Sequence, residues 1–337
     1  TYAALVRASK EAIKAVDPTA KIGGPCVTGI NGYWGRDYFT EAMEAGMGDD
    51  IDAITLHPYT QDAVDVTNMD QNIDWFLDEF SKYNGTKTPE IWNTEMGYSS
   101  AEDGIDERTK GALNSRAAIL YKAKNLSDKT VFYNFEKKGI IKTDKEHQFG
   151  HVSPAAKRAD KSGKSFVPTE SFAMITGLNY VMARSRAETI IDSPDGNIRI
   201  CQFYSDKFGV ELLAIYAIKE AAQTTLFLGT DQITCYDAFG NDRNIYGEGG
   251  VYTFRVDQEP TYITGDFQRV EFAENNALIG FEPASLEAAE GEFLQITIQN
   301  YTGKEYSVEA KLPQNVTLVK NYGFTGGQGS LVLRNTA

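Results

Sequence analysis

The stretch that decides the fold is PEIWNTEMGY, residues 89–98, where an apolar run ends on a carboxylate shortly before a glycine. Short strands that are buried on both faces are typical of parallel sheets. In a barrel built from such strands, reactive side chains project from the carboxyl ends, where the loops into the helices gather. We therefore take Glu95, at the end of this strand, as the first candidate for a functional side chain.

Residues 1–184 repeat this alternation of apolar strands and amphipathic helices. The expected strands are KIGGPCV (21–27), IDAITLHPY (51–59), EIWNTEM (90–96) and KTVFYNFE (129–136). The expected helices are 2–16, 36–46, 69–83, 107–126 and 168–185. Strands that alternate with helices indicate parallel βαβ units. Four strands are half the number in a closed (β/α)8 TIM barrel.

The character of the sequence changes near residue 185. Seven short strands are expected in 185–265, separated by turn signals such as those at 194–196 (PDG) and 240–242 (GND). This pattern is typical of an antiparallel β-sandwich. Residues 266–337 alternate like an immunoglobulin-like β module, either complete or truncated. The fold class is therefore α/β plus all-β, with domains at 1–184, 185–265 and 266–337.

Composition and charge exclude several classes of partner. The formal net charge is −14, spread along the chain, which argues against nucleic acid and against an anionic membrane surface. No run is long and apolar enough for membrane insertion. The three cysteines make no disulfide framework, and a bridge between Cys201 and Cys235 and buried free thiols both stay open. The chain begins on a helix without a signal peptide, which indicates a piece of a longer protein.

Aromatic and polar side chains gather at the expected strand ends. They are Asn31, Tyr33 and Trp34 after the first strand, His57 and Tyr59 on the second, Asn93 and Glu95 on the third, and Tyr133, Phe135 and Glu136 on the fourth. Aromatic rings stack on the C–H faces of a sugar, while carboxylates bind its hydroxyls or attack its anomeric carbon. Each residue alone has a simpler structural explanation, such as a salt bridge or a core histidine. Their conjunction at successive strand ends favours a sugar site.

We expect no metal and no cofactor. His147 and His151 lie four residues apart, but no glutamate follows the first one as a zinc protease requires, and the segment is loop-like. The sequence also contains no phosphate-binding glycine loop.

These motifs resemble those of a known family. Residues 1–184 look like the C-terminal half of the barrel of a clan A retaining glycoside hydrolase, most similar to the β-xylosidases and α-L-iduronidases. The segment 2–24 is similar to helix four leading into strand five, ITLHPY (54–59) to strand six, IWNTEMGY (91–98) to strand seven with its nucleophile motif, and VFYNFE (131–136) to strand eight. Residues 236–265 resemble the β-sandwich that follows the barrel in these enzymes.

The resemblance implies roles for the strand-end residues. Glu95 would be the nucleophile and would form a glycosyl-enzyme ester, which water hydrolyses with net retention. Tyr59 would hydrogen-bond Glu95 and orient it, and His57 would support that pair or contact a sugar hydroxyl. The other candidates for substrate binding are Asn93 and Glu136 for hydroxyls, Tyr133 or Phe135 for the floor of the −1 subsite, and Tyr33 and Trp34 at the barrel mouth.

The chain departs from the family's pattern in two places. The tryptophan that the family often has on strand eight is absent from residues 129–136. The mechanism also needs a second, protonated carboxyl group about 5 Å from the nucleophile. In the family it follows an asparagine at the end of strand four, and no such pair stands at a strand end here. We therefore expect the N-terminal half of the barrel, as an upstream segment or a separate chain, to pack against strands five and eight and to supply the general acid.

The leading hypothesis is a retaining glycoside hydrolase that acts on a β-linked oligo- or polysaccharide outside the cell or at its surface. The alternative is a non-catalytic carbohydrate-binding or scaffold protein with a decayed barrel. A transglycosidase or polysaccharide-processing factor would differ in its acceptor and not in its nucleophile.

Overall fold

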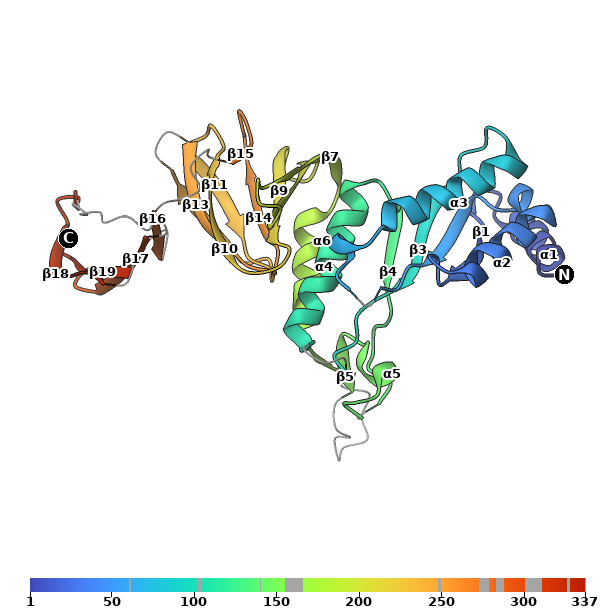
Figure 1. Ribbon diagram of the computed structural model, residues 1–337, viewed down its shortest axis with the longest axis horizontal. Coiled ribbons are helices and arrows are strands. Elements are labelled where there is room, and N and C mark those ends of the chain that lie inside the picture. Colours follow the sequence, from blue (N-terminus) through green and yellow to red (C-terminus); the bar gives the residue numbers. More distant parts are fainter. Residues whose placement is uncertain are drawn as a thin grey trace. The chain divides into compact units, whose positions relative to one another are not determined.

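The fold is taken from a computed structural model of the chain, shown in Figure 1. It describes residues 1–60, 62–101, 105–139, 141–154, 166–247, 250–272, 279–282, 288–300, 311–325 and 328–336. The chain divides into two compact units. The first comprises residues 1–190, 201–207 and 238–240, and the second comprises residues 191–200, 208–237 and 241–337.

The first unit is built on a four-stranded parallel sheet. Its strands are β1 (Gly23–Thr28), β2 (Ala53–His57), β3 (Glu90–Met96) and β4 (Lys129–Phe132), in the order β1-β2-β3-β4. The four strands expected from the sequence are therefore present, and they pair in parallel. Within the described residues β1 and β4 are the edges of this sheet.

Strand β4 is shorter than the sequence predicts. It ends at Phe132, so the expectation that it runs to Glu136 is wrong. The reason lies in the backbone hydrogen bonds. Val152 N donates to Phe135 O and Lys137 N donates to Val152 O, both at 2.9 Å, so the chain after Tyr133 pairs with a different segment instead of extending the sheet. Tyr133, Phe135 and Glu136 therefore follow the strand.

Helices cover one face of this sheet. The helices of the first unit are α1 (Tyr2–Val16), α2 (Tyr33–Glu44), α3 (Met69–Asn84), α4 (Glu107–Ala123), α5 (Lys145–Gln148) and α6 (Glu170–Met182), with 3₁₀ turns at Met47–Asp50 and Val64–Val66. A short hairpin, β5 (Val152–Pro154) with β6 (Phe166–Pro168), precedes α6. Helix α2 begins at Tyr33, three residues before its expected start at Arg36, so Tyr33 and Trp34 belong to its first turn and not to the preceding loop.

The two faces of the sheet carry different side chains. Ile54, Leu56 and Ile91 join Phe39 and Phe76 of the helices in one buried core. Because successive side chains of a strand point to opposite faces, the residues between them lie on the other face. That second face carries Thr55, His57, Trp92 and Thr94.

The later strands pair in antiparallel sheets. They are β7 (Ser185–Asp192), β8 (Ile198–Ser205), β9 (Val210–Ala217), β10 (Ala222–Phe227), β11 (Gln232–Tyr236), β12 (Asp242–Tyr246), β13 (Val251–Val256), β14 (Thr261–Gly265) and β15 (Glu271–Phe272). They form a six-stranded sheet in the order β12-β11-β14-β9-β8-β7 and a three-stranded sheet in the order β13-β10-β15. Ile215 and Ile263 of the first sheet share a buried core with Leu226 and Phe254 of the second.

The sequence predicts all of these strands except β12 and β15. Strand β12 is an edge strand in which only Ile245 is buried, so it lacks the alternation that reveals a strand. A further sheet in the order β16-β17-β19-β18 is formed by β16 (Ile279–Glu282), β17 (Phe293–Asn300), β18 (Val316–Thr325) and β19 (Gln328–Asn335).

Two further expectations concern the cysteines and the membrane. None of the three cysteines is part of a disulfide, so Cys201 and Cys235 are buried thiols, the bridge between them does not form, and Cys26 is exposed. Among the described residues, no helix combines the length and the apolarity that crossing a bilayer requires.

Candidate active site

Glu95 lies at the end of β3 beside two side chains from the end of β2. Tyr59 Oη donates a hydrogen bond of 2.6 Å to Glu95 Oε1. His57 Nδ1 lies 3.6 Å from the other oxygen, Glu95 Oε2. Burial, together with the hydrogen bond to the Glu95 carboxylate, raises the pKa of Tyr59 above its ordinary value. Tyr59 therefore stays protonated at neutral pH and remains the donor.

His57 connects this pair to a thiol. Cys26 Sγ lies 2.9 Å from His57 Nε2, on the opposite side of the imidazole from Glu95. Cys26 Sγ also lies 3.8 Å from Thr94 Oγ1. Strands β1, β2 and β3 thus each contribute one member of a chain that runs from Cys26 through His57 to Glu95.

Three aromatic rings, those of Tyr59, Tyr133 and Phe149, pack together beside the Glu95 carboxylate. The Tyr59 ring packs edge-on against Tyr133 and Phe149, with centroids 6.5 Å and 5.9 Å away. The rings of Tyr133 and Phe149 are 5.4 Å apart. Tyr133 Oη donates a hydrogen bond of 2.9 Å to Glu146 Oε2, which also receives one of 3.1 Å from Lys138 Nζ. These contacts place an aromatic surface beside Glu95.

Gly97 allows β3 and the end of β4 to approach closely. A Cβ atom at this position would lie 2.5 Å from the carbonyl oxygen of Tyr133. Gly97 is not among the glycines with a positive φ, so close approach of the backbone explains it better than a left-handed turn. Gly97, two residues after Glu95, therefore helps to bring Tyr133 next to Tyr59.

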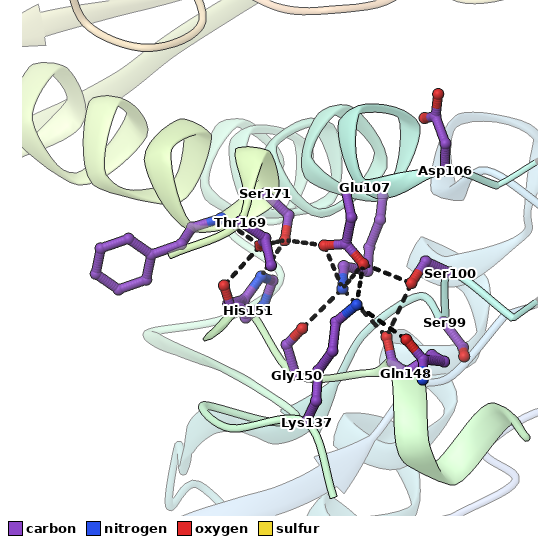
Figure 2. Close-up of polar contacts among 12 residues, drawn as sticks. Ser99, Ser100, Asp106, Glu107, Lys137, Gln148, Gly150, His151, Thr169 and Ser171 are labelled. Carbon is purple, nitrogen blue, oxygen red and sulfur yellow. Dashed lines mark hydrogen bonds and ion pairs between the residues drawn. The ribbon is translucent and has the colours of Figure 1, made fainter. Parts of the chain in front are cut away.

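A polar cluster contacts Gln148 and Gly150, the two neighbours of Phe149 in the chain (Figure 2). Its centre is Glu107 of α4, which pairs with Lys137 Nζ at 2.6 Å and with Lys110 Nζ at 3.0 Å. The hydroxyl of Ser100 donates to Glu107 at 2.6 Å and that of Ser171 at 3.2 Å. The loop after β3, the segment after β4 and helix α6 are thus all joined to one carboxylate.

The charged groups of this cluster are buried or partly buried, and the pKa values of three of its residues are shifted. Hydrogen bonds from Lys137 and Ser100 outweigh the effect of burial and lower the pKa of Glu107 to about 2. Burial lowers the pKa of Lys110, which is fully enclosed, to about 8. Burial, reinforced by the charge of Lys110, also lowers the pKa of His151 to about 4. His151 is therefore neutral at pH 7.

Lys110 fixes the backbone on both sides of Phe149. Its Nζ donates to the carbonyl oxygens of Gln148 at 3.1 Å and Gly150 at 2.8 Å. A clamp on both neighbours restricts where the Phe149 ring points, and that ring packs on Tyr59. The cluster thus acts on Glu95 through a series of contacts, because it holds Phe149, which packs on Tyr59, which in turn bonds Glu95.

The structure brings only part of the expected site together. His57, Tyr59, Glu95 and Tyr133 form one group. Asn93 is 2% exposed and lies on the same face of β3 as Ile91, which packs under the helices, so it does not join them. Tyr33 and Trp34 are 76% and 86% exposed at the start of α2 and contact each other.

Phe135 and Glu136 also lie apart from the group. The Phe135 ring packs against Phe172 at 6.3 Å. Glu136 forms a β-bridge with Val152. Because β4 ends before them, neither side chain is presented at a strand end next to Glu95.

Sequence reasoning missed Cys26, Phe149 and the cluster around Glu107. Cys26 lies two positions before the end of β1. Its place near the carboxyl end of an expected strand could have marked it as a candidate, as it did for His57 and Glu95. Phe149 lies in a loop with no periodic pattern. The cluster joins residues as far apart as Ser100 and Ser171, and no local motif connects them.

One protein-family model matches the part of the chain that contains His57, Tyr59, Glu95 and Tyr133. Residues 3–149 match the family model described as "Glycosyl hydrolase catalytic core". No curated protein sequence matches the chain. The matched residues include β1 to β4 and every member of the Glu95 group.

Solved structures show the same fold. A family 39 glycoside hydrolase from Bacteroides cellulosilyticus WH2 superposes with a TM-score of 0.60 at 17% identity, over 78% of this chain and 54% of that one. A glucosidase from Croceicoccus marinus gives 0.54 at 13%, over 78% and 64%. A family 51 α-L-arabinofuranosidase from Thermotoga petrophila RKU-1 gives 0.52 at 13%, over 79% and 62%.

The chain thus spans between about half and two thirds of the length of each of these relatives. The mixed helix and strand architecture with several sheets is consistent with their TIM-barrel-like folds. Residues 3–149 are therefore similar to the catalytic core of glycosyl hydrolases, and the solved neighbours share the fold of the chain.

Proposed function

We propose that this chain carries the nucleophile of a retaining glycoside hydrolase, and that the nucleophile is Glu95. The observation that carries the proposal is the carboxylate of Glu95 at the end of β3, held by Tyr59 at 2.6 Å and flanked by His57 at 3.6 Å. A nucleophilic carboxylate needs a fixed orientation towards the anomeric carbon, and a phenol donor on one oxygen supplies it. The other oxygen, Oε2, is the one that attacks.

The reaction proceeds by two displacements. Glu95 Oε2 forms a bond to the anomeric carbon while the glycosidic oxygen leaves with a proton from a general acid, which gives a glycosyl-enzyme ester. Water then attacks the same carbon from the opposite face and releases Glu95, so the configuration is retained. His57 lies where it can contact a sugar hydroxyl or support Glu95.

Tyr133 is the proposed floor of the −1 subsite. Its ring contacts Tyr59 and Phe149, and the three rings offer an apolar surface next to the carboxylate. Sugar C–H faces pack on such surfaces. Tyr133 and Phe149 would then take the place of the tryptophan that stands on strand eight in many relatives.

We further propose that residues 1–184 are strands five to eight of a (β/α)8 barrel, followed by a β-sandwich at 185–265 and an immunoglobulin-like module at 266–337. Among the described residues no further strand pairs with β1 or β4 in this sheet, which supports the proposal, because an unpaired strand edge invites pairing with another strand. The N-terminal half of the barrel would pair with both edges and bring the general acid. The substrate class is a β-linked oligo- or polysaccharide, and the site of action is outside the cell or at its surface.

Azide rescue tests the nucleophile. In Glu95→Gly, activity towards aryl β-glycosides with a good leaving group should fall by about 10³-fold or more and return with azide, giving a glycosyl azide of inverted configuration. A good leaving group needs no general acid, so the assay reports on Glu95 alone. Glu136→Gly is the matched control and should yield no glycosyl azide. Sugar binding without azide-dependent turnover in Glu95→Gly would favour the carbohydrate-binding alternative.

A further inference from the structure

The thiol of Cys26 lies in a position that the proposed reaction does not use. Cys26 is the exposed member of the chain's three cysteines, while Cys201 and Cys235 are 0% and 3% exposed. Its sulfur is 2.9 Å from His57 Nε2, and the other ring nitrogen of His57 faces Glu95 Oε2 at 3.6 Å. A thiol, an imidazole and a carboxylate therefore stand in series across three neighbouring strands.

The order of these groups determines which way a proton moves. A carboxylate beside Nδ1 favours the imidazole tautomer with its hydrogen on Nδ1, which leaves Nε2 as an acceptor facing the sulfur. When the thiol loses its proton to Nε2, the imidazolium that forms lies next to the negative charge of Glu95. An imidazole that accepts the thiol proton, with a carboxylate on its other side, activates a cysteine as a nucleophile.

We propose that Cys26 is a thiol-modification site for small disulfides and that its modification shuts off the Glu95 site. In the reaction, Sγ attacks one sulfur of the disulfide and forms a new S–S bond. The old S–S bond breaks, its other half leaves as a thiolate with the electron pair, and the thiol proton passes to His57. The product is a mixed disulfide at Cys26, and a thiol reductant reverses it.

The consequence for the site follows from the same contacts, and it rests on the proposed function of Glu95. A group added to Sγ must occupy space beside His57, because the sulfur and Nε2 are already in contact. His57 then loses its place next to Glu95 Oε2, and the added group occupies the face of the sheet on which a sugar would bind. Modification should therefore block formation of the glycosyl-enzyme ester.

The first test measures how fast the Cys26 thiol reacts with a small disulfide. Dithiodipyridine, added to the native chain, should release one rapid equivalent of thiopyridone, with the two buried thiols reacting only after unfolding. Cys26→Ser should abolish the rapid phase. His57→Gln should slow it about tenfold near neutral pH, because the base that takes the proton is gone. Thr94→Val removes the neighbouring hydroxyl at 3.8 Å but no base that can take the thiol proton, so the rate should stay within about twofold.

One result of the thiol assay would overturn the proposal: a rate equal to that of an unfolded cysteine peptide and unchanged by His57→Gln. If His57→Gln does not fold, the rate of the unaltered chain decides instead. A reaction faster than that of an unfolded cysteine peptide under the same conditions supports the relay, whereas an equal or slower reaction overturns it.

The second test separates this inference from the proposed function. The chain with its mixed disulfide and the same chain after reduction are each treated with an activated 2-fluoro glycoside, and the Glu95 peptide is analysed by mass spectrometry. Label only after reduction supports the inference. Equal label in both forms overturns the inference but leaves Glu95 as the nucleophile. No label in either form contradicts the proposed function, while the thiol assay still reports on Cys26.

Discussion

Tyr59 Oη lies 2.6 Å from Glu95 Oε1, and this bond joins the ends of two neighbouring parallel strands. The tyrosine is buried enough to keep its proton, so the bond fixes one oxygen of the carboxylate and leaves the other towards His57. The proposed chemistry depends on that fixed orientation.

Tyr59→Phe should slow attack by Glu95 while the fold is kept. The ring still packs on Tyr133 and Phe149, but the carboxylate loses its donor, and misplacement of a reacting group costs roughly 10- to 100-fold. The measurement is the rate of labelling by an activated 2-fluoro glycoside. Tyr83→Phe is the matched control, because it also removes a phenol bonded to a glutamate, but that partner is Glu44, which lies outside the site. Equal effects of the two substitutions would show that the bond to Glu95 has no special role.

Lys110→Met should destabilise the first unit and loosen Phe149. Methionine fills a similar volume but leaves the carbonyls of Gln148 and Gly150 without a buried donor, which costs about 1 to 3 kcal/mol. Urea unfolding followed by tryptophan fluorescence measures this, since all three tryptophans lie in the first unit. Lys122→Met on the same helix is the control and should change the free energy by less than about 0.5 kcal/mol. A midpoint shift no larger than that of the control would contradict the clamp.

The stability of the first unit should fall when the solution is made mildly acidic. The pKa of His151 is lowered from 6.5 to about 4, so between these values the unfolded chain binds a proton that the folded chain does not. The resulting stabilisation is fully present above pH 6.5 and is lost as the pH falls towards 4. Between pH 7 and pH 5 the loss should be about 2 kcal/mol.

Substitution of single histidines identifies the group responsible. His151→Gln should remove most of this pH dependence from the urea midpoint. His147→Gln should leave it in place, because the His147 side chain is 28% exposed. A pH dependence that survives His151→Gln would assign it to other groups. Glu107 acts at lower pH, since its depressed pKa of about 2 makes its contribution disappear between about pH 4.5 and pH 2.

The regular elements could be predicted from the sequence because their periodicity is local. The strand ITLH and helix 69–83 appear where apolar spacing placed them, since each buries one continuous face or run. The end of β4 could not be predicted. Its continuation, YNFE, is as apolar and aromatic as the strand itself, and the partner that diverts it is Val152, which is distant in sequence.

The site was predictable in part for the same reason. His57, Tyr59 and Glu95 follow from strand ends that meet at one edge of a parallel sheet. Asn93 was expected to bind a sugar hydroxyl, but its place two residues after Ile91 puts both side chains on the face under the helices. Glu95 does not follow this alternation, because the pairing of β3 with β4 shifts register between Asn93 and Met96. Phe149 and Lys110 depend on tertiary contacts that leave no trace in local sequence.

The central claim is that Glu95 is a nucleophile, and trapping it is the most direct test. The protein is incubated with 2-fluoro glycosides that carry an activated leaving group, digested, and analysed by mass spectrometry. The account predicts one added sugar on the peptide that contains Trp92 to Tyr98, with fragmentation placing it on Glu95, and no label in Glu95→Gln. Label on another carboxylate, or sugar binding that never produces a covalent adduct, would contradict it.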